Sequence, residues 1–475
     1  MTTNTSPGEN QQVIASQGVG STHPTKSLDV LRGIGLLAAL FISIRIFSGF
    51  GPQMQSHLIV SAKGGNYGLY AAMEFLFDGK MRALIAIVFG ASMVIFFSKN
   101  SNDSLKPGEV FIRRQIALII LGLINALIFL WTHDILFHLG VMGILVFPFI
   151  RLSNRGLFIA ALLVTLIYSG KLFWNYADDK KNHRKYETLT ALSKKYNDDS
   201  TAKAKQGLKV KKDTLTKLEK EDTSAWSNRL SSMKVDVKKD EGDKKTMREV
   251  AYWKTWNYLV PRIQSREAQW TYEKGIWDLG GMIFLGMLLY RIGFFNNRFS
   301  SKTYLLLTLL CFAGGFLFGW FRLHHQQLAL TDYLKYINRH LLPYDFFFPF
   351  ERALVALGFV SMVMLLLPVK LFHPVWRAFA SAGQLALSNY LIQSIVCTIF
   401  FYGYGMGYFG MLNQIQLYFF VLEVIMVQMV LSIIWLRYYN YGPAEWLLRR
   451  VSYGRPLPGS FRKSPAVEPA IPALT

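Results

Sequence analysis

The chain has 475 residues, of which 52% are hydrophobic and only 17% are charged, whereas about a quarter of the residues in soluble domains are charged. Its formal net charge is +22, but the basic residues fall mainly in short loops between apolar stretches. This placement is typical of membrane proteins and argues against nucleic-acid binding, which needs basic residues gathered on one face. Cys311 and Cys397 both fall inside apolar stretches, so neither a disulfide framework nor a metal site is predicted.

Ten stretches of the chain are apolar over roughly 16 to 25 residues, and a helix needs about 20 apolar residues to cross a hydrocarbon core of about 30 Å. In chain order they are Leu28–Phe47, Ala72–Phe97, Ile112–Leu130, Ile135–Ile150, Leu157–Trp174, Ile276–Phe294, Tyr304–Leu323, Ala353–Leu371, Ala386–Gly403 and Leu417–Leu436. Backbone groups in lipid must be satisfied within the chain, so these stretches predict helices. We expect an all-α fold, a polytopic membrane helix bundle of about ten transmembrane helices in a lipid bilayer. Nothing in the sequence predicts an oligomeric state.

Short loops rich in Lys and Arg alternate along the chain with loops nearly free of them. The rich loops carry Arg113 and Arg114, then Arg151 and Arg155, then Arg291, Arg298 and Lys302, then Lys370 and Arg377. Short cytoplasmic loops of membrane proteins carry the excess of Lys and Arg. The alternation therefore predicts a multi-pass protein with both termini in the cytoplasm.

The pattern divides the chain into five parts. The tails at 1–25 and 456–475 are expected to be disordered and cytoplasmic. Five spans fall in 26–175, and five more, with interfacial segments, fall in 251–455. Between them, 176–250 is predicted to be a soluble helical insertion outside the membrane, since its core, 178–249, holds 20 Lys or Arg and 14 Asp or Glu. Its few apolar residues suit an amphipathic helical hairpin that the bundle does not need for folding.

Ionisable residues gather at the predicted outer ends of the spans. Such residues are costly inside a membrane and are functional candidates by default. Asp78 and Arg82 open the second span, His133 and Asp134 link the third to the fourth, and His57 follows the first. Further examples are Arg45, Lys80, Asp278, Arg322, His324, His325, Glu351 and Arg352. We expect the first five to converge on one polar cavity, the alternative being interfacial anchors or ion pairs within the bundle.

A smaller polar set lies at the predicted inner ends. Asp29 and Arg32 are three residues apart and share a helix face, so they can form a salt bridge with each other or contact an anionic group entering from the cytoplasm. Asn389 and Gln393 begin the ninth span. Glu423 and Asn125 lie deeper, where we expect buried hydrogen bonds.

Several segments together resemble a known bacterial family. They are Phe77-Asp78-Gly79-Lys80-Met81-Arg82, His133-Asp134-Ile135-Leu136, Gly383-Gln384-Leu385-Ala386-Leu387-Ser388-Asn389-Tyr390-Leu391-Ile392-Gln393-Ser394 and Tyr441-Gly442-Pro443-Ala444-Glu445-Trp446. The chain resembles the domain of unknown function 418 (DUF 418) family, the YeiB-like membrane proteins. The resemblance covers nearly the whole chain except the tails and the insertion, and it implies a bacterial inner membrane protein.

The start of the first span, Ser27-Leu28-Asp29-Val30-Leu31-Arg32-Gly33, is similar to the opening of heparan-glucosaminide acetyltransferase and its bacterial relatives. Those transmembrane acyltransferases take an acyl group from coenzyme A in the cytoplasm and deliver it to a sugar on the other side. A histidine after the first span is their key residue, and His57 has a comparable place here. Its distance from Asp29 and Arg32 differs from the family pattern, and Ser43 stands where an asparagine is expected.

The first functional hypothesis is therefore a transmembrane acyltransferase acting on an extracytoplasmic glycan or lipid acceptor. A neutral histidine, His57 by the resemblance, would act as general base, and Arg82 or Arg45 would stabilise the developing oxyanion. Asp29, Arg32, Asn389 and Gln393 would lie near an acyl-coenzyme A donor.

Two other classes use the same residues differently. A solute or proton-coupled transporter would use Asp78, Asp134 and Glu423 as protonatable relays, although the two halves show no convincing internal repeat. A structural or sensor protein would instead bind a partner through the inserted helices.

Overall fold

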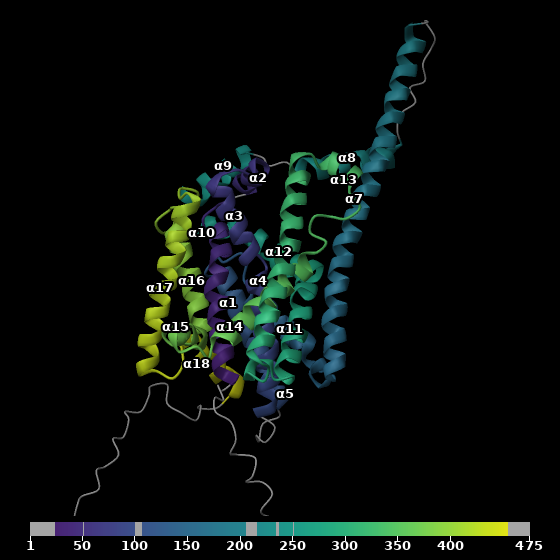
Figure 1. Ribbon diagram of the computed structural model, residues 1–475. Coiled ribbons are helices and arrows are strands. Elements are labelled where there is room, and N and C mark those ends of the chain that lie inside the picture. Colours follow the sequence, from purple (N-terminus) through teal and green to yellow (C-terminus); the bar gives the residue numbers. More distant parts are fainter. Residues whose placement is uncertain are drawn as a thin grey trace, which may run out of the picture.

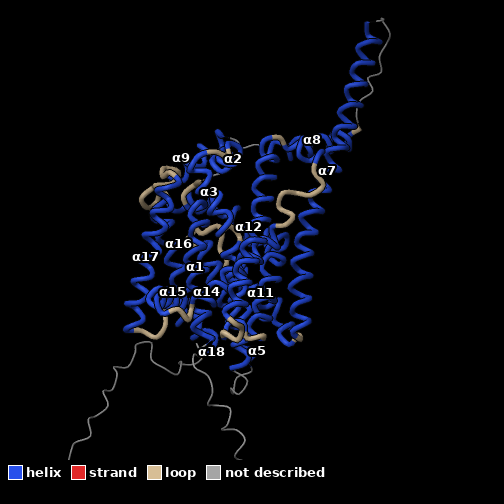
Figure 2. The backbone as a smooth tube through the Cα atoms, in the orientation of Figure 1, coloured by secondary structure: helices blue, strands red, loops and turns tan. Residues whose placement is uncertain are grey.

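The computed structural model describes residues 24–50, 52–99, 107–205, 216–233, 237–249 and 251–454. The two predicted tails lie almost entirely outside the described residues. Within the described ranges the chain forms helices joined by short loops, as the apolar stretches predict (Figures 1 and 2). The all-α fold is confirmed.

The first half of the bundle contains α1 (Pro24–Phe47), α2 (Pro52–Ser61), α3 (Gly64–Leu76), α4 (Lys80–Lys99), α5 (Pro107–Leu127), α6 (Leu136–Val146), the 3-10 turn η1 (Phe147–Arg151) and the beginning of α7 (Asn154–Lys205). The predicted insertion comprises the rest of α7, α8 (Lys217–Met233) and α9 (Val237–Glu249). The second half contains α10 (Tyr252–Ser265), the π-helical η2 (Arg266–Gly275), α11 (Ile276–Arg291), η3 (Phe294–Asn296), α12 (Ser301–Thr331), α13 (Tyr333–Arg339), α14 (Phe348–Leu366), η4 (Lys370–Phe372), α15 (His373–Gln384), α16 (Ala386–Phe401), α17 (Gln414–Tyr438) and α18 (Pro443–Tyr453).

The count of ten spans is not confirmed. Each predicted stretch coincides with a helix, but within the described ranges only seven helices are long and apolar enough to cross a membrane, or eight if α15 and α16, bent by 81°, count as one. The others, α6 and α11, have 11 and 16 residues. Helix α11 is apolar because other helices surround it, with Leu279 and Ile283 fully buried. Apolar composition does not separate lipid-facing from protein-facing helices.

The predicted second span is interrupted near its start. Phe77-Asp78-Gly79 forms a turn between α3 and α4, in which Gly79 adopts φ +71°. A left-handed conformation of this kind favours glycine. The turn places Asp78 inside the bundle between two helices instead of on the side of one long helix.

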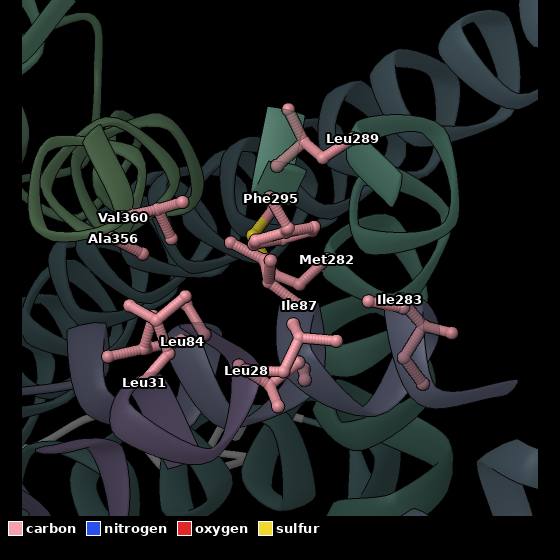
Figure 3. Packing of buried hydrophobic residues seen from close by; sticks show 14 of the residues in the cluster. Leu28, Leu31, Leu84, Ile87, Met282, Ile283, Leu289, Phe295, Ala356 and Val360 are labelled. Atoms are coloured by element: carbon pink, nitrogen blue, oxygen red, sulfur yellow. The ribbon is translucent and has the colours of Figure 1, made fainter. Parts of the chain in front are cut away.

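The apolar core lies where α1, α4, α11 and α14 meet. Leu31, Ile87, Ile283 and Val360 from these four helices are all fully buried, and Figure 3 shows their side chains packed around one another. The core thus holds together helices from both halves of the chain.

Close helix contacts join α1 to α15. A Cβ atom at Gly383 would lie 1.8 Å from the carbonyl oxygen of Asp29, and one at Gly33 would lie 2.0 Å from that of Phe379. Only glycine permits backbones to approach this closely, as is common between membrane helices.

The insertion packs on the bundle at two places. Helix α7 continues without a break past the other helices and projects beyond them (Figure 1). Trp226 of α8 is buried in a cluster with Tyr176 and Tyr336. Met247 of α9 is buried in a core cluster of the bundle, and its carbonyl accepts a hydrogen bond from Gly403 N. The few apolar residues of the insertion are therefore used for docking.

The bundle has two different ends. The insertion end carries α2, α9 and the projecting part of α7, and the termini end carries α18 and the beginning of α1 (Figure 1). The first turn of α1 is fixed at the termini end by the Ser27 hydroxyl, which donates to the carbonyl of Phe295. Both ends of the described chain thus lie at the same end of the bundle.

Candidate functional site

A network of buried ion pairs occupies the half of the bundle near the insertion end. Its centre is Arg322 of α12, whose Nε lies 2.8 Å from Glu351 Oε2 and whose Nη1 lies 3.1 Å from Glu74 Oε2. Asp78 is 3.9 Å from the same Nη1. Three carboxylates from three segments therefore share one guanidinium group.

Two more cations complete the network. The Lys80 ammonium donates to Glu351 Oε1 and, at 2.7 Å, to the carbonyl oxygen of Glu74. Arg45 Nη1 donates to Glu74 Oε1 at 2.6 Å, and its guanidinium also contacts the hydroxyl of Tyr418. Burying charges is costly unless they are paired and hydrogen-bonded in this way.

A second group of charges lies beside the first. Asp278 of α11 pairs with Arg82 at 2.6 Å and with Arg352 of α14. The two groups interact, since the Asp78 carboxylate lies in the field of the Arg82 guanidinium. Asp78 and Arg82 are thus brought together, each with a partner that lies far away in sequence.

Asp134, next to these charges, accepts hydrogen bonds from uncharged groups. Its Oδ1 accepts from Asn125 Nδ2 at 2.8 Å and its Oδ2 from the backbone N–H of Phe137 at 2.8 Å. The Tyr390 hydroxyl, which accepts from Ile135 N, also bonds to Asp134. The expectation of a buried hydrogen bond at Asn125 is confirmed.

An open pocket of about 330 Å³ lies over this region at the insertion end. It is lined by His133, Arg262, Ser265, Arg266, Gln269, Trp270, Glu273 and Lys274. Three of these side chains are cationic and one is anionic, so the lining favours an anionic group. Arg266 Nε is buried without a hydrogen-bond partner among the described residues.

Trp270 connects the pocket to the buried charges. Its indole ring contacts the guanidinium of Arg266, 3.5 Å from the ring centroid, and that of Arg82, 5.5 Å away. His138 packs edge-on against the same ring at 4.7 Å. Cation–π contacts of this kind hold guanidinium groups in place while leaving their N–H donors free.

The surroundings set the charge of the pocket residues. Desolvation and the nearby guanidinium groups of Arg266 and Arg82 lower the pKa of the His133 imidazole below its usual value, although the residue itself is exposed at the pocket. Burial raises the pKa of Asp134 to about 6, against its hydrogen bonds. Burial and the nearby Asp134 raise the pKa of Glu267 to about 8. At neutral pH His133 is therefore a neutral imidazole.

His57 is not among the residues that line the pocket. It is on the exposed face of α2, while its neighbours Leu58 and Ile59 pack into the bundle. Within the described residues it takes part in no hydrogen bond or ion pair with Asp78, Arg82, His133 or Asp134. Its place after the first span thus does not bring it to the pocket.

The polar residues at the termini end form a separate group. Arg32 pairs with Asp29 at 2.7 Å and contacts Ser92 Oγ at 3.2 Å. Asn389 donates to the carbonyl of Ala382 and to Ser432 Oγ. Arg32 and Asn389 thus contact the adjacent carbonyls of Gly383, at 3.5 Å, and Ala382.

Gln393 lies further along the same helix and bonds to another helix. Its Nε2 donates to Gln428 Oε1 at 2.9 Å, and Gln428 Nε2 donates to the carbonyl of Asn389. The amides of Asn389 and Gln393 therefore join α16 to α17. Among Asp29, Arg32, Asn389 and Gln393, the side chain accessible to a ligand is that of Arg32, which is 34% exposed.

Several residues of the site were not predicted from the sequence. Glu74 and His138 are buried and Tyr390 is partly buried in the networks above, and Arg266 and Trp270 line the pocket. Glu74 did carry a signal, since it is a carboxylate within the apolar run from Tyr70 to Phe77. The prediction for Glu423 was wrong, because its side chain is exposed on α17.

Part of the chain matches a known protein family. Residues 289–455 match the model of the family described as protein of unknown function DUF418. The predicted resemblance to this family is confirmed. The matched segment runs from the end of α11 through α18, so it includes Glu351, Arg352 and Asn389 but not the pocket.

Curated relatives cover the rest of the chain. The chain is 25% identical to the uncharacterized protein YeiB of Escherichia coli (strain K12) over 449 residues, 90% of this chain and 95% of that protein. It is 24% identical to the uncharacterized protein YxaH of Bacillus subtilis (strain 168) over 438 residues, 90% and 93% of the two chains. No solved structure matches. The similarity and the apolar helices support a bacterial multi-pass membrane protein and assign no activity.

Proposed function

We propose that this protein is a transmembrane acyltransferase of the bacterial inner membrane, with its termini in the cytoplasm. It would transfer an acyl group from a coenzyme A thioester to a hydroxyl of an extracytoplasmic glycan or lipid. The observation that carries the proposal is the pocket at the insertion end. There the accessible imidazole of His133 lies among cationic groups, and Trp270 links the pocket to the buried charges through Arg82.

In the proposed reaction His133 acts as general base in place of His57. Its imidazole takes the proton of the acceptor hydroxyl while the hydroxyl oxygen attacks the thioester carbonyl. The carbon–sulfur bond then breaks, and the imidazolium returns the proton to the departing thiolate, giving an ester and free coenzyme A. Thr132 Oγ1, 3.0 Å from His133 Nδ1, orients the ring.

Charge stabilisation in this scheme comes from two arginines. The negative charge that develops on the carbonyl oxygen needs preorganised donors. Arg266 lines the pocket and, within the described part of the chain, is in no ion pair. Arg82 lies on the same indole ring but is held by Asp278. We therefore assign the oxyanion to Arg266, with Arg82 shaping the field.

The donor would enter at the termini end. Arg32 is partly exposed there, and a guanidinium is suited to the phosphates of coenzyme A. Asp29 holds Arg32 in place through their ion pair. In this scheme Asn389 and Gln393 support the donor site by fixing the bend between α15 and α16.

The test is acyl transfer in reconstituted vesicles. Purified protein is given radiolabelled acetyl-coenzyme A on the termini side together with a bacterial membrane extract of glycans and lipids, and labelled ester is measured. His133→Ala should lower transfer about 100-fold or more, as expected for loss of a general base. The matched control is His57→Ala, which should transfer at the wild-type rate.

Two results would reject this assignment. Equal transfer by wild type and His133→Ala would remove His133 from the chemistry. Loss of transfer in His57→Ala alone would restore the role that the sequence resemblance gives to that residue.

A second candidate is proton-coupled transport, which the buried carboxylates favour. Glu74, Asp78 and Glu351 surround Arg322, and Asp278 pairs with Arg82 beside them. Intramembrane carboxylates commonly act as proton relays. Absence of transfer with every acyl donor, together with proton uptake driven by a solute gradient, would favour this function.

A further inference from the structure

Helix α17 lies at the edge of the bundle (Figures 1 and 2) and exposes a long stripe of large side chains. These are Phe419, Met426, Val430 and Ile434, with exposed fractions of 62, 60, 55 and 45%. With Glu423 included, the first four of these positions are spaced four, three and four residues apart, and Ile434 follows four residues later. Residues at this spacing form the contact seam between two helices that pack against each other with a left-handed twist.

Glu423 stands in the middle of this stripe. Its side chain is exposed, and it forms no hydrogen bond or ion pair with any described residue. The positions three and four residues away, Phe419, Phe420, Met426 and Val427, are all apolar. Glu423 is nine residues from the start of α17, about 14 Å along the helix axis, so it lies well inside the apolar length of the span.

A carboxyl group in that position needs a partner from outside the chain. Exposure to hydrocarbon is unfavourable for a carboxylate and also for an unpaired neutral carboxyl group. The comparable exposed face of α12, from Leu305 to Trp320, is formed by residues without an ionisable side chain. The exposed face of α12 therefore has no counterpart of Glu423.

We propose that α17 is a dimerisation surface, on which two copies of this chain pack with Glu423 of each hydrogen-bonded to Glu423 of the partner subunit. A neutral carboxyl group has one donor and an acceptor oxygen, so two of them satisfy each other. A two-fold axis along the membrane normal brings identical residues together. A second copy of the chain therefore provides the matching carboxyl group. Hydrogen bonds between polar side chains join helices in membrane proteins.

The stripe on either side of Glu423 fits the same arrangement. Phe419 and Met426 flank the carboxyl group one turn away in each direction and would exclude lipid from the pair. The inference does not depend on the proposed enzymatic function, because α17 contributes no residue to the lining of the pocket.

The test is disulfide cross-linking in native membranes. The two buried cysteines, Cys311 and Cys397, are first replaced by alanine, and one cysteine is introduced by Met426→Cys or Val430→Cys. Mild oxidation should yield covalent dimers of this chain, identified by joining copies that carry two different tags. The matched control is Leu317→Cys on the exposed face of α12, which should stay monomeric.

Substitution of Glu423 tests the hydrogen bond. In the Met426→Cys background, Glu423→Gln keeps a donor and an acceptor and should preserve the dimer. Glu423→Leu removes both and should lower the cross-linked fraction about 3- to 20-fold.

Three results would overturn the proposal. One is cross-linking at residues 426 and 430 no greater than at 317 in protein that is folded and membrane-inserted. Another is full dimer formation by Glu423→Leu, and a third is a cross-link to a different protein in place of a second copy.

Discussion

The two ends of the bundle place polar groups among apolar helices in different ways. Near the insertion end, charges are buried in pairs that span several helices, as in the contact of Glu351 with Lys80 and Arg322. Near the termini end, neutral amides bond to each other, as Gln393 does to Gln428. An apolar pair could often replace a buried ion pair without loss of stability. The insertion end therefore retains charges that folding alone does not require, which is expected of a functional site.

The largest effect should come from removing one member of the network. Glu351→Ala would leave Lys80 and Arg322 without their shared carboxylate, and loss of one partner of a buried pair costs about 3–5 kcal/mol. Thermal unfolding of the purified protein in mild detergent should show a sharp fall in melting temperature.

The matched control for this change is Glu187→Ala. Glu187 is on the insertion, with a side chain 58% exposed, so its loss should change stability by no more than about 0.5 kcal/mol. Equal melting temperatures for the two variants would mean that the buried network is not energetically connected.

At the termini end the sensitive feature is close packing. Gly383→Ala would place a methyl group 1.8 Å from the Asp29 carbonyl and should destabilise the protein by about 1–3 kcal/mol. In Gly170→Ala, the added methyl meets nothing within 4 Å, and stability should stay the same or rise slightly. A similar melting temperature for both variants would contradict the close contact of α1 with α15.

The pH dependence of stability tests the environment of Asp134, next to the pocket. Its pKa in the folded protein, about 6, lies above the value of 3.8 that it has without these surroundings. Between those pH values the folded protein binds more protons than the unfolded chain, so the contribution of Asp134 to stability falls as pH rises. Asp134→Asn does not titrate, and its stability relative to wild type should increase by up to about 3 kcal/mol from pH 4 to pH 7.

This prediction is checked by melting curves of both proteins at several pH values. A difference between wild type and Asp134→Asn that is constant with pH would show that the Asp134 pKa is not raised.

The smallest effect is expected on the insertion itself. Arg229 pairs with Asp179 at 3.2 Å, but its side chain is 54% exposed, and surface pairs contribute only about 0–1 kcal/mol. Arg229→Ala should therefore leave the melting temperature nearly unchanged, with any difference vanishing in high salt. A large loss of stability would mean that the insertion is as tightly coupled as the bundle.

The sequence predicts the helices well and their partners poorly. All ten apolar stretches became helices because hydrophobic length is a local property. The turn at Asp78 and Gly79 could not be predicted from hydropathy. These few polar residues lie near the start of a long apolar stretch, where they do not interrupt its average hydrophobicity. The docking of α9 through Met247 depends on the Gly403 backbone, 156 residues further along the chain.

The candidate site, too, could be predicted only where the signal is local in the sequence. Asp78, Arg82, His133 and Asp134 were identifiable because each is an ionisable residue beside an apolar stretch. Which of His57 and His133 lines the pocket could not be predicted, because it depends on which face of a helix packs inward. The partners Asp278 for Arg82 and Tyr390 for Asp134 lie 196 and 256 residues away in sequence, and only the fold brings them together.

The most direct test of the central claim is a cryo-electron microscopy structure with a non-hydrolysable thioether analogue of acetyl-coenzyme A. The account predicts phosphate density beside Arg32 and the acetyl group beside His133, within reach of Arg266. Density for the acetyl group at the exposed face of α2 near His57, or for the whole analogue outside the bundle, would contradict it.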